Sequence, residues 1–262
     1  MIRNQPSSPS ELTILGGGGW IPTGTAATCT ALLRRGPAAV LIDAGTGIER
    51  LVAEPSLLDG VERLDLVLTH FHLDHVTGLA YLPALRFATA VPPRIWGPAQ
   101  VLFGTSSEEA LRRLLGPPFS DADFGLTAAE VNELAEGEQA IGPFALRTRV
   151  QPGHSTPTLA LRFGDALAYV TDTPYDAGNA RFAAGVRLLV HEAWYTEGAP
   201  EASDIHTSGR GAATVARDAG VDELLLIHLH PRGDHDAVLE EARAVFPNVA
   251  LAHDGLRREL EL

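Results

Sequence analysis

The sequence contains no lysine: all 20 of its basic residues are arginine, and 33 acidic residues outnumber them to give a formal net charge of −13. This charge argues against a protein that wraps a long polyanion, because the field of the whole molecule would repel it. Cysteine is nearly absent as well. The single Cys29 excludes an intramolecular disulfide framework and any zinc site built from several cysteines.

Long apolar runs are also missing. No run approaches the roughly 18 residues of a membrane-spanning helix, and the opening MIRNQPSSPS has no apolar segment of signal-peptide length. We therefore expect a soluble, cytoplasmic protein without a membrane partner. A chain of 262 residues with 45% apolar content can build a real core. With one cysteine and ten histidines, its chemistry must come from histidine and carboxylate side chains.

Short apolar runs bounded by turn residues predict strands in both halves of the chain. These runs are Leu12–Leu15, Thr30–Leu33, Ala39–Ile42, Leu64–Thr69, Phe144–Val150, Leu159–Phe163, Ala166–Thr171, Leu188–His191, Leu224–Ile227 and Val249–Ala252. Helices are predicted at Ile48–Ala53, Val76–Leu85, 105–116, Gly209–Gly220 and Asp236–Val245, with Ser106 or Ser107 capping the third. Sets of strands with interspersed helices indicate the α/β or α+β class, although periodicity alone does not choose the topology.

The segment Leu66–His75 joins a buried strand to a dense group of potential metal ligands. His70 and His72 point to the same side of an extended chain. Asp74 and His75 follow where a helix begins, so their side chains approach from a second direction. Four candidate ligands within six residues exceed what one zinc ion needs from so short a span. The segment therefore favours a two-metal site.

The pattern His-x-His-x-Asp-His after a strand resembles the metallo-β-lactamase superfamily. Further matches follow in the same order along the chain, namely Gly153-His154-Ser155, Thr171-Asp172-Thr173 and Leu226-Ile227-His228. The resemblance implies that one metal ion is held by His70, His72 and His154, the second by Asp74, His75 and His228, and that Asp172 bridges both. It also implies a four-layer αββα sandwich with pseudo-symmetric halves, which we take as a single domain over residues 1–262. Imidazoles and carboxylates without thiolates suit two Zn²⁺ ions, with Mn²⁺ or Fe as alternatives.

Two more motifs resemble the tRNase Z and phosphodiesterase branch of this superfamily. Leu189–Ala193 is similar to its His-Glu-Ala segment, and Ile205–Ser208 to its His-Ser/Thr element. The resemblance implies that His206 is the general acid for the leaving oxygen and that Glu192 orients it. Together with Asp74 they form the expected catalytic set. A histidine beside a carboxylate can be poised near pH 7 for this task, while a purely structural Glu192–His206 pair is the alternative.

The chain differs from tRNase Z because it has no segment long enough to form a tRNA-binding arm at the usual position. Only 17 residues lie between His154 and Asp172, where those enzymes typically carry a tRNA-binding arm. This absence and the acidic charge disfavour tRNA 3′ processing. The extra length lies instead at 97–140, which we interpret as a lid or insertion with Pro117–Phe124 as a pocket wall. A simple surface excursion is the alternative.

Several aromatic and basic residues near these motifs have two interpretations. Trp194 and Tyr195 either stack on a substrate ring or pack against a neighbouring helix. His230 and His235 either extend the second-metal group or lie outside it. Arg232 either binds a phosphate or is an exposed turn residue.

The remaining polar positions are expected to support the site. We interpret His191, His253 and Asp254 as structural residues or as residues that contact the ligands. The glycine-rich Leu15–Thr23 resembles the opening segment of the same branch, which lies near the active site. Phosphate binding by these glycines is a weak prediction, because no lysine or Ser/Thr follows at P-loop spacing.

These observations predict a dinuclear metal-dependent phosphodiesterase that acts on a small or cyclic phosphodiester. Its nucleophile would be a hydroxide bridging the two metals. The alternatives are hydrolysis of carboxylic esters, lactones or thioesters, tRNA 3′ processing, and a non-hydrolytic metal-binding or mononuclear iron oxygenase activity. The expected partner is a small anionic molecule rather than a long nucleic acid. Analogy with the phosphodiesterase branch suggests a homodimer.

Overall fold

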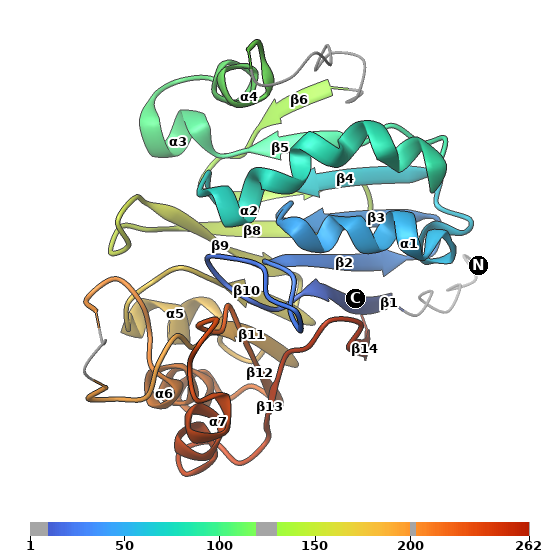
Figure 1. Cartoon of the computed structure of the whole chain (residues 1–262). Helices are drawn as coiled ribbons and strands as arrows, with labels where there is room; N and C mark the ends of the chain where they lie inside the picture. The colour runs from blue at the N-terminus through green and yellow to red at the C-terminus, as the bar shows by residue number, and fades with distance from the viewer. Residues whose placement is uncertain (1–9, 119–129, 200–202, 262) are drawn as a thin grey trace, which may run out of the picture.

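The first sheet gathers strands from the first half of the chain and the last strand. The computed structural model describes residues 10–118, 130–199 and 203–261 (Figure 1). The strand order within them is β14-β1-β2-β3-β4-β5-β6, antiparallel from β14 to β3 and parallel from β3 to β6. The bounds are β1 Ser10–Gly16, β2 Thr30–Arg35, β3 Ala38–Ile42, β4 Arg63–Val67, β5 Arg94–Gly97, β6 Glu130–Glu133 and β14 Arg257–Leu260.

The second sheet repeats this plan, with an antiparallel part followed by a parallel part. Its order is β13-β12-β11-β10-β9-β8-β7, antiparallel from β7 to β10 and parallel from β10 to β13. The bounds are β7 Gly137–Ile141, β8 Phe144–Gln151, β9 Thr158–Phe163, β10 Leu167–Val170, β11 Leu188–Glu192, β12 Glu223–Ile227 and β13 Val249–Leu251.

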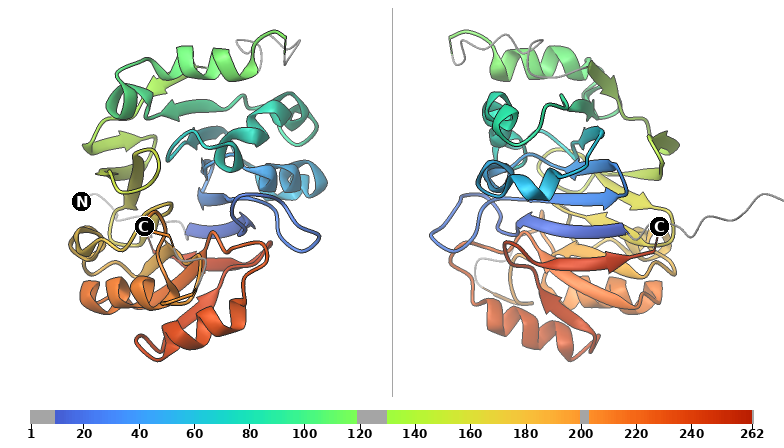
Figure 2. Two further views of the ribbon diagram at one scale, coloured as in Figure 1. Left: turned by 60° about the vertical axis from the view of Figure 1, so that its left-hand side comes forward. Right: turned by 90° about the vertical axis from the view of Figure 1, so that its right-hand side faces the viewer.

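Helices cover the outer face of each sheet, as Figure 2 shows from two sides. The first group is α1 Glu49–Ala53, α2 Leu73–Val76, α3 Ala99–Phe103 and α4 Ser107–Leu115, with 3-10 turns at Thr46–Ile48, Pro55–Leu58 and Thr77–Phe87. The second group is α5 Ala177–Phe182, α6 Gly209–Ala219 and α7 His235–Arg243. No helix among the described residues is long and apolar enough to cross a membrane.

Three apolar clusters separate the layers and give the predicted αββα order. The largest lies between the sheets and includes Val40 from the first and Leu161 from the second. A second cluster lies beneath the helices of the first half, around Leu51 and Leu66. The third joins α5, α6 and α7 to the second sheet. The prediction of a four-layer metallo-β-lactamase sandwich is therefore confirmed.

The helix predicted over Val76–Leu85 forms as a 3-10 helix over Thr77–Phe87. Pro83 lies inside the run and has no N–H for an α-helical hydrogen bond. Gly78 packs so closely that a Cβ there would lie 2.2 Å from the carbonyl oxygen of Gly45. Tight packing thus sets this segment against the sheet in a shorter-period form.

The segment 97–140 does more than cross the surface. Its described parts supply α3, α4 and the edge strands β6 and β7, so it passes from the edge of one sheet to the edge of the other. Most of Pro117–Phe124 lies outside the described residues. Its role as a lid or pocket wall stays a prediction.

The parallel parts of the sheets position the site. The segments that leave the carboxyl ends of β3 and β4 carry Asp43 and His70, while those leaving β10 and β12 carry Asp172 and His228. In open parallel sheets, functional groups gather beyond these strand ends. Here the carboxyl ends of the parallel strands of both sheets lie at the same edge of the sandwich (Figure 1).

Candidate metal centre and active site

Three residues at these strand ends have left-handed backbone conformations. Asp43, Asp172 and His228 have φ angles of 59°, 49° and 54°. Such angles are uncommon for residues with a side chain and cluster at functional sites. Each residue follows a buried strand closely, so the sharp turn directs its side chain to the end of the sandwich instead of along the sheet.

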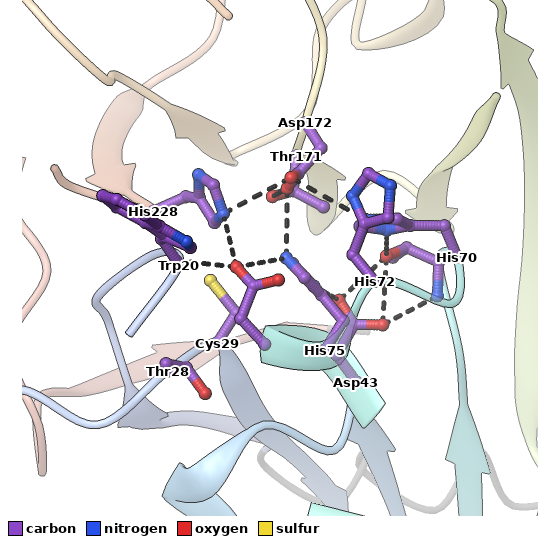
Figure 3. A network of polar contacts seen from close by, with 12 residues as sticks. Trp20, Thr28, Cys29, Asp43, His70, His72, His75, Thr171, Asp172 and His228 are labelled. Atoms are coloured by element: carbon purple, nitrogen blue, oxygen red, sulfur yellow. Dashed lines mark hydrogen bonds and ion pairs between the residues drawn. The ribbon is translucent and has the colours of Figure 1, made fainter. Parts of the chain in front are cut away.

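The first predicted ligand group comes together as the resemblance implies. Potential ligand atoms of His70, His72, His154 and Asp172 all lie within 4.8 Å of one another. The Nε2 atoms of His70 and His154 are each 3.7 Å from Asp172 Oδ2. His72 presents its other nitrogen, with Nδ1 3.2 Å from His154 Nε2. Figure 3 shows His70 and His72 on the same side of the centre.

The second predicted group meets the same aspartate from the opposite side. His75 Nε2 lies 3.2 Å from Asp172 Oδ1, and His228 Nε2 lies 3.3 Å from Asp172 Oδ2. Asp74 Oδ2 is 3.1 Å from His228 Nε2 and 3.6 Å from His75 Nε2. Asp172 therefore lies between the two groups (Figure 3), which is where a bridging carboxylate belongs.

The outward nitrogens of three histidines are occupied by other groups. The ring Nδ1 atoms of His70, His75 and His154 lie 3.0 Å from Thr69 Oγ1, 2.8 Å from Asp43 Oδ2 and 2.9 Å from the Ile205 carbonyl oxygen, respectively. These contacts orient each ring with Nε2 towards the centre. Among the described residues, the buried Nε2 atoms of His70 and His75 have no hydrogen-bond partner. Buried nitrogens without partners, facing carboxylates, fit a divalent metal ion.

The electrostatics of the centre favour ligand forms. Burial lowers the pKa values of His70, His72 and His154, which keeps these imidazoles neutral. Burial by itself would raise the pKa of Asp172, but His228, His75 and His70 together hold it well below its usual value. At His75 burial lowers the pKa, but the carboxylates of Asp172, Asp43 and Asp74 outweigh burial and raise it. A metal ion would therefore displace a proton from His75, whereas the other three imidazoles and the Asp172 carboxylate already have the forms that bind metal ions.

The predicted pair His206 and Glu192 also forms beside this centre. His206 Nδ1 lies 2.7 Å from Glu192 Oε2, and Glu192 is fully buried at the end of β11. The backbone N–H of Thr173 donates to Oε1 of the same carboxylate. Burial raises the pKa of Glu192 and lowers that of His206. His206 also belongs to a group of potential ligands with Asp172 and His228, which places its ring at the edge of the metal centre.

The aromatic residues after β11 hold this pair. The ring of Trp194 stacks on His206 at 4.6 Å and on His228 at 4.9 Å between centroids. Tyr195 donates from its hydroxyl to the main-chain oxygens of Ser203 and His206, the latter at 2.6 Å. Trp194 therefore packs on the histidine rings. Tyr195 contacts both the histidine segment and the start of α6, where the Gly209 N–H donates to its main-chain oxygen at 3.0 Å.

The more distant histidines have main-chain and aromatic contacts. His230 packs edge-on against Trp194, and His235 Nε2 lies 2.8 Å from the His230 carbonyl oxygen. The groups of potential ligands found among the described residues include neither of them. His191 is fully buried, and its Nδ1 lies 2.8 Å from the Glu192 carbonyl oxygen. Arg232 is exposed.

Two buried residues near the centre were not among the predicted site residues. Asp43 accepts hydrogen bonds from the backbone and hydroxyl of Thr69 in addition to its contact with His75. Its place directly after a strand parallel to the one before His70 is the signal that could have found it. Cys29, set aside as a lone cysteine, lies within 4.8 Å of ligand atoms of His75 and His228. Burial raises the pKa of this thiol, so the neutral form is favoured.

Comparison with known proteins agrees with this geometry. The family model described as "Beta-lactamase superfamily domain" matches residues 38–229. A protein named Ribonuclease Z from Methanopyrus kandleri is 30% identical over 278 residues, covering 94% of this chain and 96% of its own length. A Ribonuclease Z from Mycobacterium sp. (strain KMS) is 31% identical, with 95% of each chain covered.

Solved structures show the same fold at lower identity. The metallo-beta-lactamase fold protein YhfI from Bacillus subtilis covers 96% of this chain with a TM-score of 0.78 and 24% identity. A diphosphatase from the PhnP family covers 97% with a TM-score of 0.74 and 19% identity. Human tRNase Z, short form, covers 96% with a TM-score of 0.72 and 18% identity.

Proposed function

The chain belongs to the metallo-β-lactamase superfamily of metal-dependent hydrolases, and we propose that it is a dinuclear phosphodiesterase acting on a small or cyclic phosphodiester. The observation that carries this proposal is the His206–Glu192 pair, in which Nδ1 and Oε2 are 2.7 Å apart, beside the two predicted ligand groups that meet at Asp172. A proton donor beside the metals is what an alkoxide leaving group requires.

The proposed ligand sets follow the two groups in the structure. His70, His72 and His154 would hold one ion, Asp74, His75 and His228 the other, and Asp172 both. We propose zinc at both positions, since no thiolate is required and imidazole suits Zn²⁺, with Mn²⁺ or Fe as the alternatives to test. Two divalent ions held there supply a hydroxide nucleophile near neutral pH and neutralise the charge of the phosphoryl group.

The protein side chains would perform the remaining steps. Hydroxide would add to phosphorus, the bond from phosphorus to the leaving oxygen would break, and that oxygen would take a proton from His206 Nε2. His206 would regain its proton from the water molecule that becomes the next hydroxide. Glu192 holds Nδ1 of the same ring, so the ring keeps its orientation while its charge changes. Trp194, stacked on His206, limits rotation of the imidazole. Asp74, which accepts a hydrogen bond from the loop after β1, would keep its carboxylate aligned at the second metal.

Replacement of the proposed acid tests this function. We expect His206→Ala to lower kcat by about 10²–10⁴-fold while metal content per chain stays at the wild-type value. The loss should grow as the leaving group of an aryl phosphodiester becomes more basic, because a poor leaving group depends more on protonation. The matched control is His253→Ala, because His253 is exposed and belongs to none of the groups of potential ligands among the described residues. Loss of metal together with activity would instead make His206 a ligand.

A second candidate is tRNA 3′ processing, which the relatives named Ribonuclease Z favour. The short His154–Asp172 connection and the net charge of −13 oppose it. Assays of the zinc-loaded chain on a precursor tRNA, cyclic nucleotides, lactones and thioesters separate these activities directly. Cleavage of the precursor tRNA alone would replace our proposal, and about one iron per chain without hydrolysis would indicate the oxygenase alternative.

A further inference from the structure

The glycine loop, residues 17–27, lies against the second ligand group. The backbone N–H of Trp20 donates to Asp74 Oδ2 at 2.7 Å, the same oxygen that lies 3.1 Å from His228 Nε2. Gly19 approaches even more closely. A Cβ at this position would lie 2.7 Å from His228 Nε2 and 2.5 Å from the ring of Trp194. The loop backbone therefore contacts two residues assigned to the second metal.

The glycine loop keeps its contact with Asp74 although the backbone of Trp20 is strained. Trp20 has a φ angle of 63°, which is unfavourable for a bulky side chain, and its side chain is 63% exposed. Burial of the indole therefore cannot be what fixes the backbone. Some other contact must hold the loop so that the Trp20 N–H stays on Asp74.

Backbone hydrogen bonds to Leu229 hold one side of the loop, with the Gly19 N–H 3.1 Å from the Leu229 carbonyl oxygen. Asp254 adds the side-chain contact that joins the two ends of the loop. Its Oδ1 accepts a hydrogen bond from the Gly17 N–H at 3.1 Å, and its Oδ2 accepts one from the Ala27 N–H at 2.8 Å. One carboxylate thus binds both ends of the loop. The Gly18 N–H, which donates to the Ala27 carbonyl oxygen at 2.9 Å, completes the closure. Hydrogen bonds to an ionised acceptor are stronger than those to a neutral one.

Asp254 is itself anchored to both sheets. It lies in the crossing from β13 to β14, the last strands along the chain, beside the loop after β1 (Figures 1 and 2). The Ala252 N–H donates to the Leu226 carbonyl oxygen at 2.8 Å, and the Gly255 N–H to the Ile14 carbonyl oxygen at 2.7 Å. The first contact is to the strand that carries His228. The carboxylate therefore links the loop position to the frame that positions this ligand.

We propose that Asp254 is a positioning residue for the second metal ion. It holds the glycine loop so that the Trp20 N–H orients Asp74 and the Gly19 backbone supports His228. This inference rests on the proposed dinuclear site. The loop contacts described above reach Asp74 and His228, so removal of the Asp254 carboxylate acts on the second ion while the first ligand group, His70, His72 and His154, keeps its own contacts.

Asp254→Asn and Asp254→Ala test this role. Asparagine keeps the shape and one acceptor oxygen but presents an N–H₂ group to a backbone N–H, whereas alanine removes both acceptors. Glu259→Gln, an exposed acid on the following strand, removes the same charge as a control. In the metal-free chain, we expect faster hydrogen exchange in peptides covering residues 17–27 for both Asp254 variants, with β4 unchanged.

Zinc titration of the metal-free chain supplies the second measurement. We expect one binding event to keep its wild-type affinity and the other to weaken by about 10–100-fold, the usual effect of losing a contact that orients a ligand. Excess zinc should then restore kcat to Asp254→Asn, which a misfolded chain would not show. Glu259→Gln should titrate as wild type.

The outcomes separate this inference from the proposed function. Unchanged exchange in residues 17–27, or equal weakening of both binding events, would overturn the role of Asp254. Absence of phosphodiesterase activity in the wild-type chain would overturn the proposed function. It would leave the hydrogen-exchange and zinc-titration measurements on Asp254 valid, since only the restoration of kcat needs a substrate. A wild-type chain that binds a single zinc ion would remove the second site, and with it the inference.

Discussion

At the scale of single residues, the backbone conformation of three site residues is locally destabilising. Asp43, Asp172 and His228 all occupy the left-handed region, where residues with side chains are held at a cost on the order of 1–3 kcal/mol each. The packing of the buried strands that precede these three residues holds their φ angles in place. Sequence composition does not reveal such strain, because aspartate and histidine are ordinary residues until the fold imposes a positive φ.

His191 gives a pH-dependent prediction away from the metal ligands. Burial lowers its pKa to about 4, and its Nε2 has no hydrogen-bond partner among the described residues. The unfolded chain binds a proton near pH 6.5 that the folded chain excludes, so stability falls as the pH drops from about 6.5 to 4. Between pH 7 and pH 5, this histidine should lower the free energy of unfolding by about 2 kcal/mol.

The test compares urea unfolding of the metal-free wild type with His191→Asn. Asparagine keeps a donor for the Glu192 carbonyl oxygen but does not titrate. The remaining histidines are common to both chains, so the difference between them isolates His191. A variant that loses as much stability as the wild type over this pH range would show that His191 does not contribute.

The candidate ligands were predictable from sequence, but their supporting contacts were not. His70, His72, Asp74 and His75 lie within six residues and therefore stand out against scattered histidines. Asp43 and Asp254 reach the site from 27 residues before and 184 residues after His70. The sequence indicated Asp254 only as a structural residue or one that contacts a ligand, and no spacing indicates what either carboxylate binds. Only the sheet topology shows that their carboxylates bind a ligand histidine and a loop neck.

At the scale of elements, the central strands were predictable and the edges were not. Predicted Ala39–Ile42 and Leu188–His191 match β3 and β11 to within one residue, because each strand is fully buried and contains a continuous apolar run. The missed strands β5, β6, β7 and β14 lie at or near sheet edges, and all but β5 carry exposed polar residues. Their pairing partners, rather than their own pattern, make them strands.

The start of α4 gives a prediction that distinguishes two adjacent serines. Ser106 accepts a hydrogen bond from the Glu109 N–H at 3.1 Å and is the N-cap. The buried Ser107 instead accepts from the Ala99 N–H at 3.1 Å and donates to Glu133 Oε2 at 2.7 Å, which joins α4 to β6. Ser106→Ala should cost about 1 kcal/mol, the usual value for a cap.

Ser107→Ala should cost more. It leaves the buried N–H of Ala99 without a partner, a loss of about 1–3 kcal/mol, and it removes the hydroxyl bond to Glu133, whose Oε2 keeps the Gln100 N–H at 3.2 Å. Urea unfolding of the two variants measures both values in parallel. Equal costs, or a larger cost for Ser106→Ala, would show that the link between α4 and β6 contributes little.

At the scale of the whole molecule, charge limits the size of the substrate more than its sign. The net charge of −13 repels a long polyanion, whereas two divalent ions beside Asp74 and Asp172 would leave the centre locally positive. At 0.1 M salt, charges more than about 10 Å apart are largely screened. A small phosphodiester can therefore reach the centre, although the remainder of the surface is acidic.

The shared core predicts that both halves of the chain unfold together, as expected for the single domain proposed over residues 1–262. The cluster between the sheets contains Leu12 and Val40 from the first sheet and Leu161 and Leu225 from the second, so neither sheet buries its inner face without the other. We expect one cooperative transition in urea for the metal-free chain, with coincident far-UV and fluorescence midpoints.

Two tryptophan variants make this expectation specific to each half. Trp194→Phe leaves Trp96, which donates to Asp65 at 2.9 Å, as the half-buried reporter of the first sheet. Trp96→Phe leaves Trp194, which follows β11, as the reporter of the second. Trp20 is 63% exposed and should change little on unfolding. Each variant should show its fluorescence midpoint at the midpoint of its own far-UV transition. Separate midpoints within one variant would mean that the sheets are independent units, and the core between them would then contribute less than its burial implies.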